Sequence, residues 1–561
     1  VGTPTEFDAP PYIAHLVTVA SSDAEPYLQP ATLSAMYRSV RPYGGALWFP
    51  LLDDGERLQA ASDAARLSRA KIEADQATCL RREGALEGAA PWTHLYGDVA
   101  NTVKSDDRLV KAPLGLLWFG GNTHDDVLPR HSHAPSEQVL GGRLFVEGVN
   151  TMTARDVYTG RVLWRREFES LGTEGIYFDD TYADTPLSTK YNQVHIPGAN
   201  ARGTNFVAAD DGVYLVIGDS CEVLDTATGE TVRTIPLPEA VNPSGTALWT
   251  YLGIYGDLLI AGVDFANGRD AAKLLGTIEK LKERGAAWSP EWFASRRIAV
   301  IDRATGGLLW RADADHSFLH NGIVAGGDAL FVLDKLPRSI EGQRTRRGLD
   351  APDDYRIAAF DARTGEIRWE STQRVFGTWL SYSDEFDMLV EAGAAASDRS
   401  FDEVDAGLRA LQARTGETAW EKRGLEYSGP CILHNDKVIT NSRSYTTTSG
   451  VVRISDGEPI LIENPLTGDA TPWTYQRTYG CNTAVASEHL LTFRSGAAGY
   501  YDLNRQCGVA NLGGFRSGCT SNLIAADGVL NAPDFTRTCS CGYQNQTSLA
   551  LVHMPDVEMW T

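Results

Sequence analysis

The feature of this 561-residue chain that most constrains its fold is a turn sequence that returns along most of its length. Its full form is Asp-x-x-Thr-Gly-x-x-x-Trp, and an apolar stretch precedes each clear copy. Asp and Thr side chains can hydrogen-bond the turn backbone, and Gly supplies the positive φ that such a turn needs. Clear copies cover residues 156–164, 225–229 (without the Trp), 302–310, 361–369 and 412–420 (with Gln412 in place of Asp), and weaker copies cover 454–460 and 501–508.

Each copy predicts a hairpin that joins two strands of a small antiparallel sheet, with the Trp packing between neighbouring sheets. Successive glycines lie 41 to 77 residues apart, which indicates one repeated unit with loops of variable length. The sequence therefore predicts a mainly β fold: an eight-bladed β-propeller over residues 113–561, with seven blades as the alternative because the last copies are weak. A β-sandwich would need the clear copies to be coincidental.

The first 95 residues have a different, α/β pattern. We expect strands at 14–20 and 46–50, helices at 31–40 and about 56–75, a terminal strand at 77–83, and a linker at 96–112. The helix at 31–40 has Leu33, Met36, Tyr37 and Val40 on one face, and Arg41-Pro-Tyr-Gly-Gly45 ends it. These residues predict a partial Rossmann-like segment over 1–95.

Two resemblances follow from these patterns. The repeated turn resembles the blade signature of pyrroloquinoline-quinone (PQQ)-type propellers, which include quinoprotein dehydrogenases and the outer-membrane assembly lipoprotein. The segment at 1–95 is similar to the C-terminal half of a class I methyltransferase, and the combination resembles large planctomycete-type fusion proteins. That family's Gly-rich loop and acidic residue would lie before Val1, so we expect no methyl transfer from this chain alone and a missing N-terminal part of the same precursor as a partner.

Composition and charge narrow the function. Lys and Arg number 51 against 73 Asp and Glu, a net charge of −22, which disfavours nucleic-acid binding. No apolar run reaches about 18 residues, so we expect no integral membrane protein. Five of the eight cysteines lie in the last 81 residues, which favours disulfides and a periplasmic or extracellular bacterial location over a thiolate metal site. The disulfide candidates are Cys519 with Cys539 or Cys541, together with Cys481 and Cys507.

Polar clusters precede several of the expected innermost strands, where propellers converge on their axis. Histidines from separate loops could hold a divalent cation, with Ca, Mn, Zn and Cu all open. Each could equally be a hydrogen-bonded core residue, and His434, followed by Asn-Asp, is expected to be structural. The predicted metal ligands are His131, His133, His195 and His320, and the predicted catalytic residues are His195, His320, Arg130 and Lys335.

A second polar cluster lies near the C-terminus. Arg side chains bind carboxylates, and Asn, Gln and Tyr suit sugar hydroxyls. The predicted substrate-binding residues are Arg494, Arg516, Asn522, Arg537, Tyr543 and Gln544, although Arg494 and Arg516 could instead be buried struts between blades.

These clusters favour a metal-assisted, lyase-like enzyme acting on acidic polysaccharide, in which a metal or Arg neutralises a uronate carboxylate and a His or Tyr removes the adjacent proton. A non-catalytic binding or scaffold propeller is the alternative. A quinone-dependent oxidoreductase is the second alternative, with PQQ the less favoured cofactor because no two cysteines are adjacent, as the ring disulfide of quinoprotein dehydrogenases would require. A carbohydrate or small-molecule ligand is the expected partner.

Overall fold

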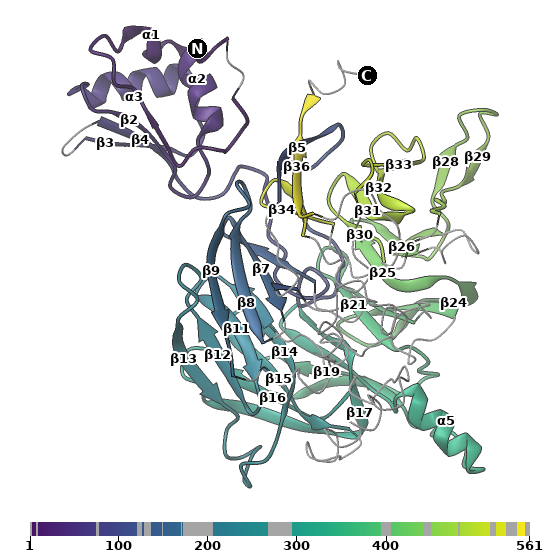
Figure 1. Cartoon of the computed structure of the whole chain (residues 1–561). Coiled ribbons are helices and arrows are strands. Elements are labelled where there is room, and N and C mark those ends of the chain that lie inside the picture. Colours follow the sequence, from purple (N-terminus) through teal and green to yellow (C-terminus); the bar gives the residue numbers. More distant parts are fainter. Residues whose placement is uncertain are drawn as a thin grey trace, which may run out of the picture.

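The computed structural model of the chain describes residues 3–6, 9–74, 78–120, 126–127, 136–148, 150–169, 171, 206–266, 294–393, 406–441, 450–478, 480, 483–515, 523–533 and 547–555. The chain is mainly β. An α/β unit at the N-terminus precedes a body of small antiparallel sheets (Figure 1). No helix among these residues is long and apolar enough to span a bilayer.

The N-terminal unit is one four-stranded sheet covered by helices. Its strand order is β1-β2-β4-β3, with β1 parallel to β2 and β4 antiparallel to both its neighbours. Helix residues such as Leu33 and Leu58 pack on Leu47 and Leu80 of the sheet. The elements are β1 (Leu16–Thr18), α1 (Glu25–Leu28), α2 (Pro30–Ser39), β2 (Ala46–Phe49), α3 (Gly55–Ala64), β3 (Ala70–Glu73) and β4 (Thr78–Arg82).

One predicted element of this unit is wrong. The second helix was expected to reach residue 75, but α3 ends at Ala64 and residues 70–73 form β3. Arg66 and Arg69 both have positive φ, 54° and 57°, which a helix does not accommodate. The remaining predicted elements of the unit are present within a few residues of their expected bounds.

The first part of the body holds three sheets. One is β6 (Gln138–Leu140), β7 (Arg143–Gly148), β8 (Thr151–Asp156) and β9 (Val162–Glu167), and the next is β10 (Phe206–Ala209), β11 (Gly212–Ile217), β12 (Ser220–Leu224) and β13 (Thr231–Pro236). A seven-stranded sheet follows, whose long strand β17 pairs with β16 on one side and with β18 on the other. Its strands are β14 (Trp249–Tyr255), β15 (Leu258–Phe265), β16 (Ala294–Asp302), β17 (Leu308–Gly326), β18 (Ala329–Asp334), β19 (Arg356–Asp361) and β20 (Ile367–Ser371). Helix α5 (Arg338–Arg346) lies between β18 and β19.

The second part completes the body. It comprises β21 (Trp379–Ser383), β22 (Met388–Ala392), β23 (Ala406–Gln412) and β24 (Thr418–Glu426); β25 (Ser428–His434), β26 (Lys437–Asn441) and β27 (Val451–Arg453); the hairpin β28 (Leu461–Glu463) and β29 (Ala470–Pro472); and β30 (Val485–Ala486), β31 (Leu490–Ser495), β32 (Ala497–Asp502) and β33 (Val509–Asn511). The last sheet is β34 (Ile524–Ala526), β35 (Val529–Ala532) and β36 (Leu549–His553), completed by β5 (Leu114–Phe119) from the start of the body.

The last sheet packs against the first. Gly142, in the β6–β7 turn, donates its backbone N–H to Asp527 Oδ2 at 2.7 Å, and Tyr158 Oη donates to the Asp527 carbonyl oxygen at 3.0 Å. Asp527 lies in the turn between β34 and β35. Because β5 also pairs with β36, both ends of the body are held in one sheet.

The N-terminal unit is fixed to this same junction. Tyr43 Oη donates to Asp527 Oδ1 at 2.7 Å, and Arg41 forms an ion pair of 2.8 Å with Asp156, the first residue of the first repeated turn. Burial raises the pKa of Asp527 to about 6. The unit therefore docks on the seam between the first and last sheets through buried polar contacts.

Candidate functional site

The innermost strands of the sheets surround a segment of the chain that we call the axial segment, residues 90–107. Successive first strands contact one another, and each also contacts the axial segment. Ordered along that segment, its partners are β6 (at Trp92), β10 (Thr93), β14 (His94), β17 (Val99), β21 (Ala100), β25 (Thr102), β30 (Val103 and Ser105) and the turn after β34 (Asp107).

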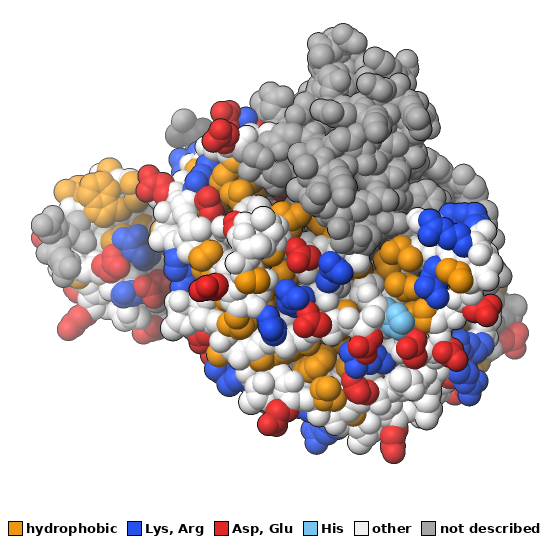
Figure 2. All heavy atoms as spheres, turned by 90° about the horizontal axis from the view of Figure 1, so that it is seen from below, with side chains coloured by type: hydrophobic (Ala, Val, Ile, Leu, Met, Phe, Trp, Pro, Cys, Tyr) orange, Lys and Arg blue, Asp and Glu red, His pale blue; other side chains and the backbone are white. Residues whose placement is uncertain are grey.

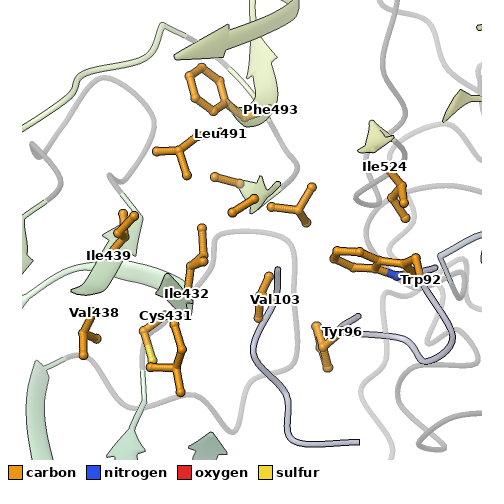
Figure 3. Close-up of a cluster of buried hydrophobic side chains, with 14 of the residues drawn as sticks. Trp92, Tyr96, Val103, Cys431, Ile432, Val438, Ile439, Leu491, Phe493 and Ile524 are labelled. Atoms are coloured by element: carbon orange, nitrogen blue, oxygen red, sulfur yellow. The ribbon is translucent and has the colours of Figure 1, made fainter. Parts of the chain in front are cut away.

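The axial segment closes on itself. Ala90 donates its N–H to Asp107 Oδ2 at 3.3 Å, and Arg108 donates to the Gly88 carbonyl oxygen at 2.8 Å. Its side chains also fill the centre: Figure 3 shows Trp92, Tyr96 and Val103 among apolar side chains from several surrounding sheets. The contacts fall at or near the ends where the first strands turn into the second, so the segment seals that end of the axis.

Polar side chains near the axis bind one sheet to the next. Gln138 donates from Nε2 to the Phe206 carbonyl oxygen and accepts from the Ala208 N–H, both at 2.6 Å. Asn441 uses its amide in the same way, accepting from the N–H of Ala484 at 2.8 Å while donating to Pro430 O at 2.8 Å. Gln138 thereby satisfies two buried backbone groups of β10, and Asn441 satisfies one of β25 and one of the residue before β30.

The predicted ligand His320 belongs to this bonding pattern. Its Nε2 lies 2.9 Å from Ser295 Oγ, which in turn lies 2.7 Å from Thr250 Oγ1. The ring is buried against Tyr251. His320 therefore links β17 to β14 and β16 through Ser295.

Two other predicted site residues are also described. Lys335 is buried, donates to the Phe376 carbonyl oxygen at 3.3 Å and lies 3.7 Å from Glu341. Arg494 is buried on β31, and its Nε lies 3.4 Å from the Gly496 carbonyl oxygen. His434, expected to be structural, holds the Ser487 and Glu488 carbonyl oxygens within 3.2 Å of its Nε2. The predicted residues Arg130, His131, His133, His195, Arg516, Asn522, Arg537, Tyr543 and Gln544 lie outside the described residues.

The cysteines that are described do not form disulfides. Cys507, predicted as a disulfide candidate, is an exposed free thiol, and Cys79, Cys221 and Cys431 are also free. Burial raises the pKa of Cys431 to about 11, so that thiol stays protonated. Cys481, Cys519, Cys539 and Cys541 lie outside the described residues. Within the described ranges, no three His, Cys, Asp or Glu side chains gather into a metal site.

One buried carboxylate near the axis was missed by the sequence analysis. Glu137 directly precedes β6, is buried, and among the described residues neither of its carboxylate oxygens has a hydrogen-bond partner. Burial raises its pKa well above the ordinary value. The search for polar clusters ahead of innermost strands could have found it, because Glu137 and Gln138 continue the cluster that was noted at His131 and His133.

Acidic and basic side chains are interspersed over the face shown in Figure 2. Ion pairs among the described side chains include that of Arg368 with Asp361, at 2.9 Å.

A comparison with known protein families indicates the type of repeat in part of the chain. The sequence profile of the outer membrane protein assembly factor BamB family matches residues 239–423 and 294–468. No curated protein matches the chain.

Solved structures with similar folds have low identity to the chain. They include the quinohemoprotein alcohol dehydrogenase from Comamonas testosteroni, with 13% identity, 82% of this chain and 80% of that chain covered and a TM-score of 0.47. A europium-containing methanol dehydrogenase has 12% identity, coverage of 79% and 88% and a TM-score of 0.44. BamB from Moraxella catarrhalis has 12% identity, coverage of 69% and 97% and a TM-score of 0.35. Our assignment of the repeat type therefore relies on the profile match within residues 239–468.

Proposed function

We propose that this chain is an eight-bladed binding propeller with PQQ-type repeats, whose axis is sealed at one end and open to a ligand at the other. The order in which the axial segment contacts β6, β10, β14, β17, β21, β25, β30 and the β34 turn supports eight blades. The match to the BamB profile supports the repeat type and a periplasmic or extracellular location.

The binding function is supported mainly by the hydrogen bonds that the buried polar side chains at the axis make. Gln138, His320 and Asn441 are buried and hydrogen-bonded to neighbouring strands, as are Ser295 and Thr250. A general base or metal ligand needs a lone pair directed at its substrate or ion, whereas the Gln138 and Asn441 amides are directed at backbone groups and His320 Nε2 at Ser295 Oγ. We therefore set aside the carbohydrate lyase, for which neither these residues nor the comparisons give support.

Glu137 favours a second candidate, a quinone-dependent oxidoreductase. Quinone cofactors in such a site would need oxygen ligands for an accompanying hard cation, and a buried carboxylate without a partner is one such ligand. The described residues do not complete the donor set, because Glu137 belongs to no group of three His, Cys, Asp or Glu side chains among them. The described residues alone therefore do not fit a quinone–metal centre.

Reconstitution separates the two candidates. The purified chain would be incubated with PQQ and Ca²⁺, and in parallel with La³⁺, then dialysed, and the retained quinone measured by absorption. We expect no stoichiometric quinone and no reduction of an artificial electron acceptor with alcohols. Retention of about one equivalent by the wild-type chain and loss of it in Glu137→Gln would overturn the binding propeller in favour of the oxidoreductase.

A further inference from the structure

Five of the repeated turns have the same kind of partner in the neighbouring sheet, whereas the turn glycine Gly306 faces Ile235 and Gly508 has no neighbour within 4 Å among the described residues. At five turns an indole covers the turn glycine, and its Nε1 donates to the carbonyl oxygen of the turn's second residue. At Gly457, for example, Trp420 covers the glycine and donates to the Ile454 carbonyl oxygen at 2.7 Å. The other four pairs are Trp118 on Gly160, Trp164 on Gly229, Trp310 on Gly365 and Trp369 on Gly416.

The hairpin β28–β29 contains the same turn again, with Asn464 in place of Asp. The sequence analysis did not predict this copy. Asn464 Oδ1 accepts from the Leu466 N–H at 2.9 Å, the Gly468 N–H donates to the Asn464 carbonyl oxygen at 2.8 Å, and Gly468 has φ +75°. The corresponding bonds at the Asp225 turn are both 2.9 Å, with Gly229 at φ +74°. The two turns therefore present the same backbone surface.

At this copy the surface is uncovered. A Cβ built on Gly468 meets nothing within 4 Å, whereas one built on Gly457 would meet Trp420 at 2.7 Å. Leu466 is 94% exposed and Leu461 is 56% exposed. The hairpin stands away from the body (Figure 1), and β28 and β29 pair only with each other among the described strands. A two-stranded hairpin with exposed apolar side chains gains stability when a partner covers it.

The charged side chains at the covered Gly457 turn indicate which charged group a partner would supply together with its indole. Two residues after Trp420, Lys422 Nζ lies 3.3 Å from the carboxylate of Glu458, the residue that follows Gly457. Asp469 holds that same position after Gly468, and among the described residues its carboxylate has no ion pair. The exposed turn therefore lacks both an indole and a cation.

A second copy of this chain does not offer an indole and a cation in this spacing. A Trp followed two residues later by Lys or Arg occurs in the sequence only at Trp164 and Trp420, and both indoles already cover turn glycines of neighbouring sheets. We propose that the Asn464–Gly468 turn and Asp469 form a docking site for a β-strand of another protein with the sequence Trp-x-Lys or Trp-x-Arg. The indole covers Gly468 and donates to the Pro465 carbonyl oxygen, and the cation pairs with Asp469.

This site is on the β28–β29 hairpin and not at the axis, so it goes beyond the proposed axial binding function, and its test is independent of quinone retention. The probe is a cyclised, fluorescently labelled peptide with the sequence of residues 408–424, which carries Trp420 and Lys422 on a hairpin. Binding to the full-length chain is followed by fluorescence anisotropy. We expect saturable binding, at least tenfold weaker when the peptide carries Trp420→Ala.

Matched variants of the chain locate the site. Asn tolerates positive φ, so Gly468→Asn keeps the turn while its side chain occupies the indole position, and at least tenfold weaker binding is expected. Gly348→Asn is the control, because Gly348 has φ +73° and equally open surroundings; it should bind normally. Asp469→Lys should weaken the wild-type peptide and recover binding with the Lys422→Glu peptide.

Three results would overturn the proposal. The wild-type chain would fail to bind the peptide, or Gly468→Asn would bind it as well as Gly348→Asn does. Alternatively, sedimentation would show a dimer of the chain that Gly468→Asn dissociates, which would make a second copy the occupant.

Discussion

The indole of Trp118 covers Gly160, and the two residues belong to the last and the first sheet of the body. A Cβ on Gly160 would lie 2.5 Å from the Trp118 ring, and Trp118 Nε1 donates to the Val157 carbonyl oxygen at 2.7 Å. The contact repeats the one that joins sheets elsewhere along the chain. Because Trp118 lies on β5, which pairs with β36, the same indole-on-glycine contact that joins consecutive sheets also closes the ring.

Loss of this contact should weaken the seam between the last and the first sheet. We expect Trp118→Ala to lower the free energy of unfolding by about 3–5 kcal/mol, because a large indole and its hydrogen bond are both removed. Trp48→Ala, at a partly exposed position in the N-terminal unit, is the control and should cost far less. Urea unfolding of the two variants provides the comparison, and equal midpoints would contradict a closing role for Trp118.

The axial segment should stabilise the body through single side chains that bridge two sheets. Asn101 Nδ2 donates to the Asn321 and Leu380 carbonyl oxygens at 3.3 and 3.2 Å, and its φ is +55°. Asn101→Gly keeps that backbone conformation but leaves two buried acceptors without this donor. We expect a loss of about 1–3 kcal/mol in urea unfolding. Gln506→Gly, at an exposed residue of φ +50°, controls for the backbone effect and should be near neutral.

Acid should weaken the axial segment through His94. Its Nε2 accepts the Ile254 N–H at 3.1 Å, and burial lowers its pKa to about 3. Because the folded-state pKa is below the unfolded value of about 6.5, the stabilisation is complete above pH 6.5 and is lost as pH falls toward 3. Between pH 6.5 and 5 we expect the wild type to lose about 2 kcal/mol more than His94→Gln. Parallel slopes for both proteins would contradict this role.

Glu137 should be a cost to stability in the absence of a cation. Burial raises its folded-state pKa, so its favourable contribution is present at low pH and is lost as pH rises. Glu137→Gln should therefore be more stable than the wild type at pH 8, with a smaller difference at pH 5. Thermal unfolding in metal-free buffer measures both. A less stable Gln variant at pH 8 would show that the carboxylate has a charged partner.

The repeated turn predicted much of the body because its chemistry is local. Gly160, Gly229, Gly306, Gly365 and Gly416 all have positive φ, and the tryptophans pack between sheets as expected. The weaker copy ending at Gly457 also forms the turn, covered by Trp420. The copy at Asn464 was not predicted, although Asn can accept the same backbone hydrogen bonds as Asp.

The axis could not be predicted in the same way. Residues 90–107 have no periodic apolar pattern, and most of them were assigned to a linker or to the N-terminal segment, because their partners are backbone groups of distant strands. His320 lies on an innermost strand, where a metal ligand could lie. The sequence does not show that Ser295 lies within hydrogen-bond distance of it. Sequence position places a side chain near the axis, while tertiary contacts decide whether it is available for chemistry.

Hydrogen exchange at the axial segment tests the central claim most directly. The backbone N–H groups of Ala208, Ala325, Tyr382, Leu433 and Ala486 all donate to carbonyl oxygens of the axial segment, one from each of the five first strands β10, β17, β21, β25 and β30. If the segment seals one end of a closed ring, peptides containing these residues should exchange together, at the rate of global unfolding. Fast exchange of these peptides, while the outer strands stay protected, would contradict the account.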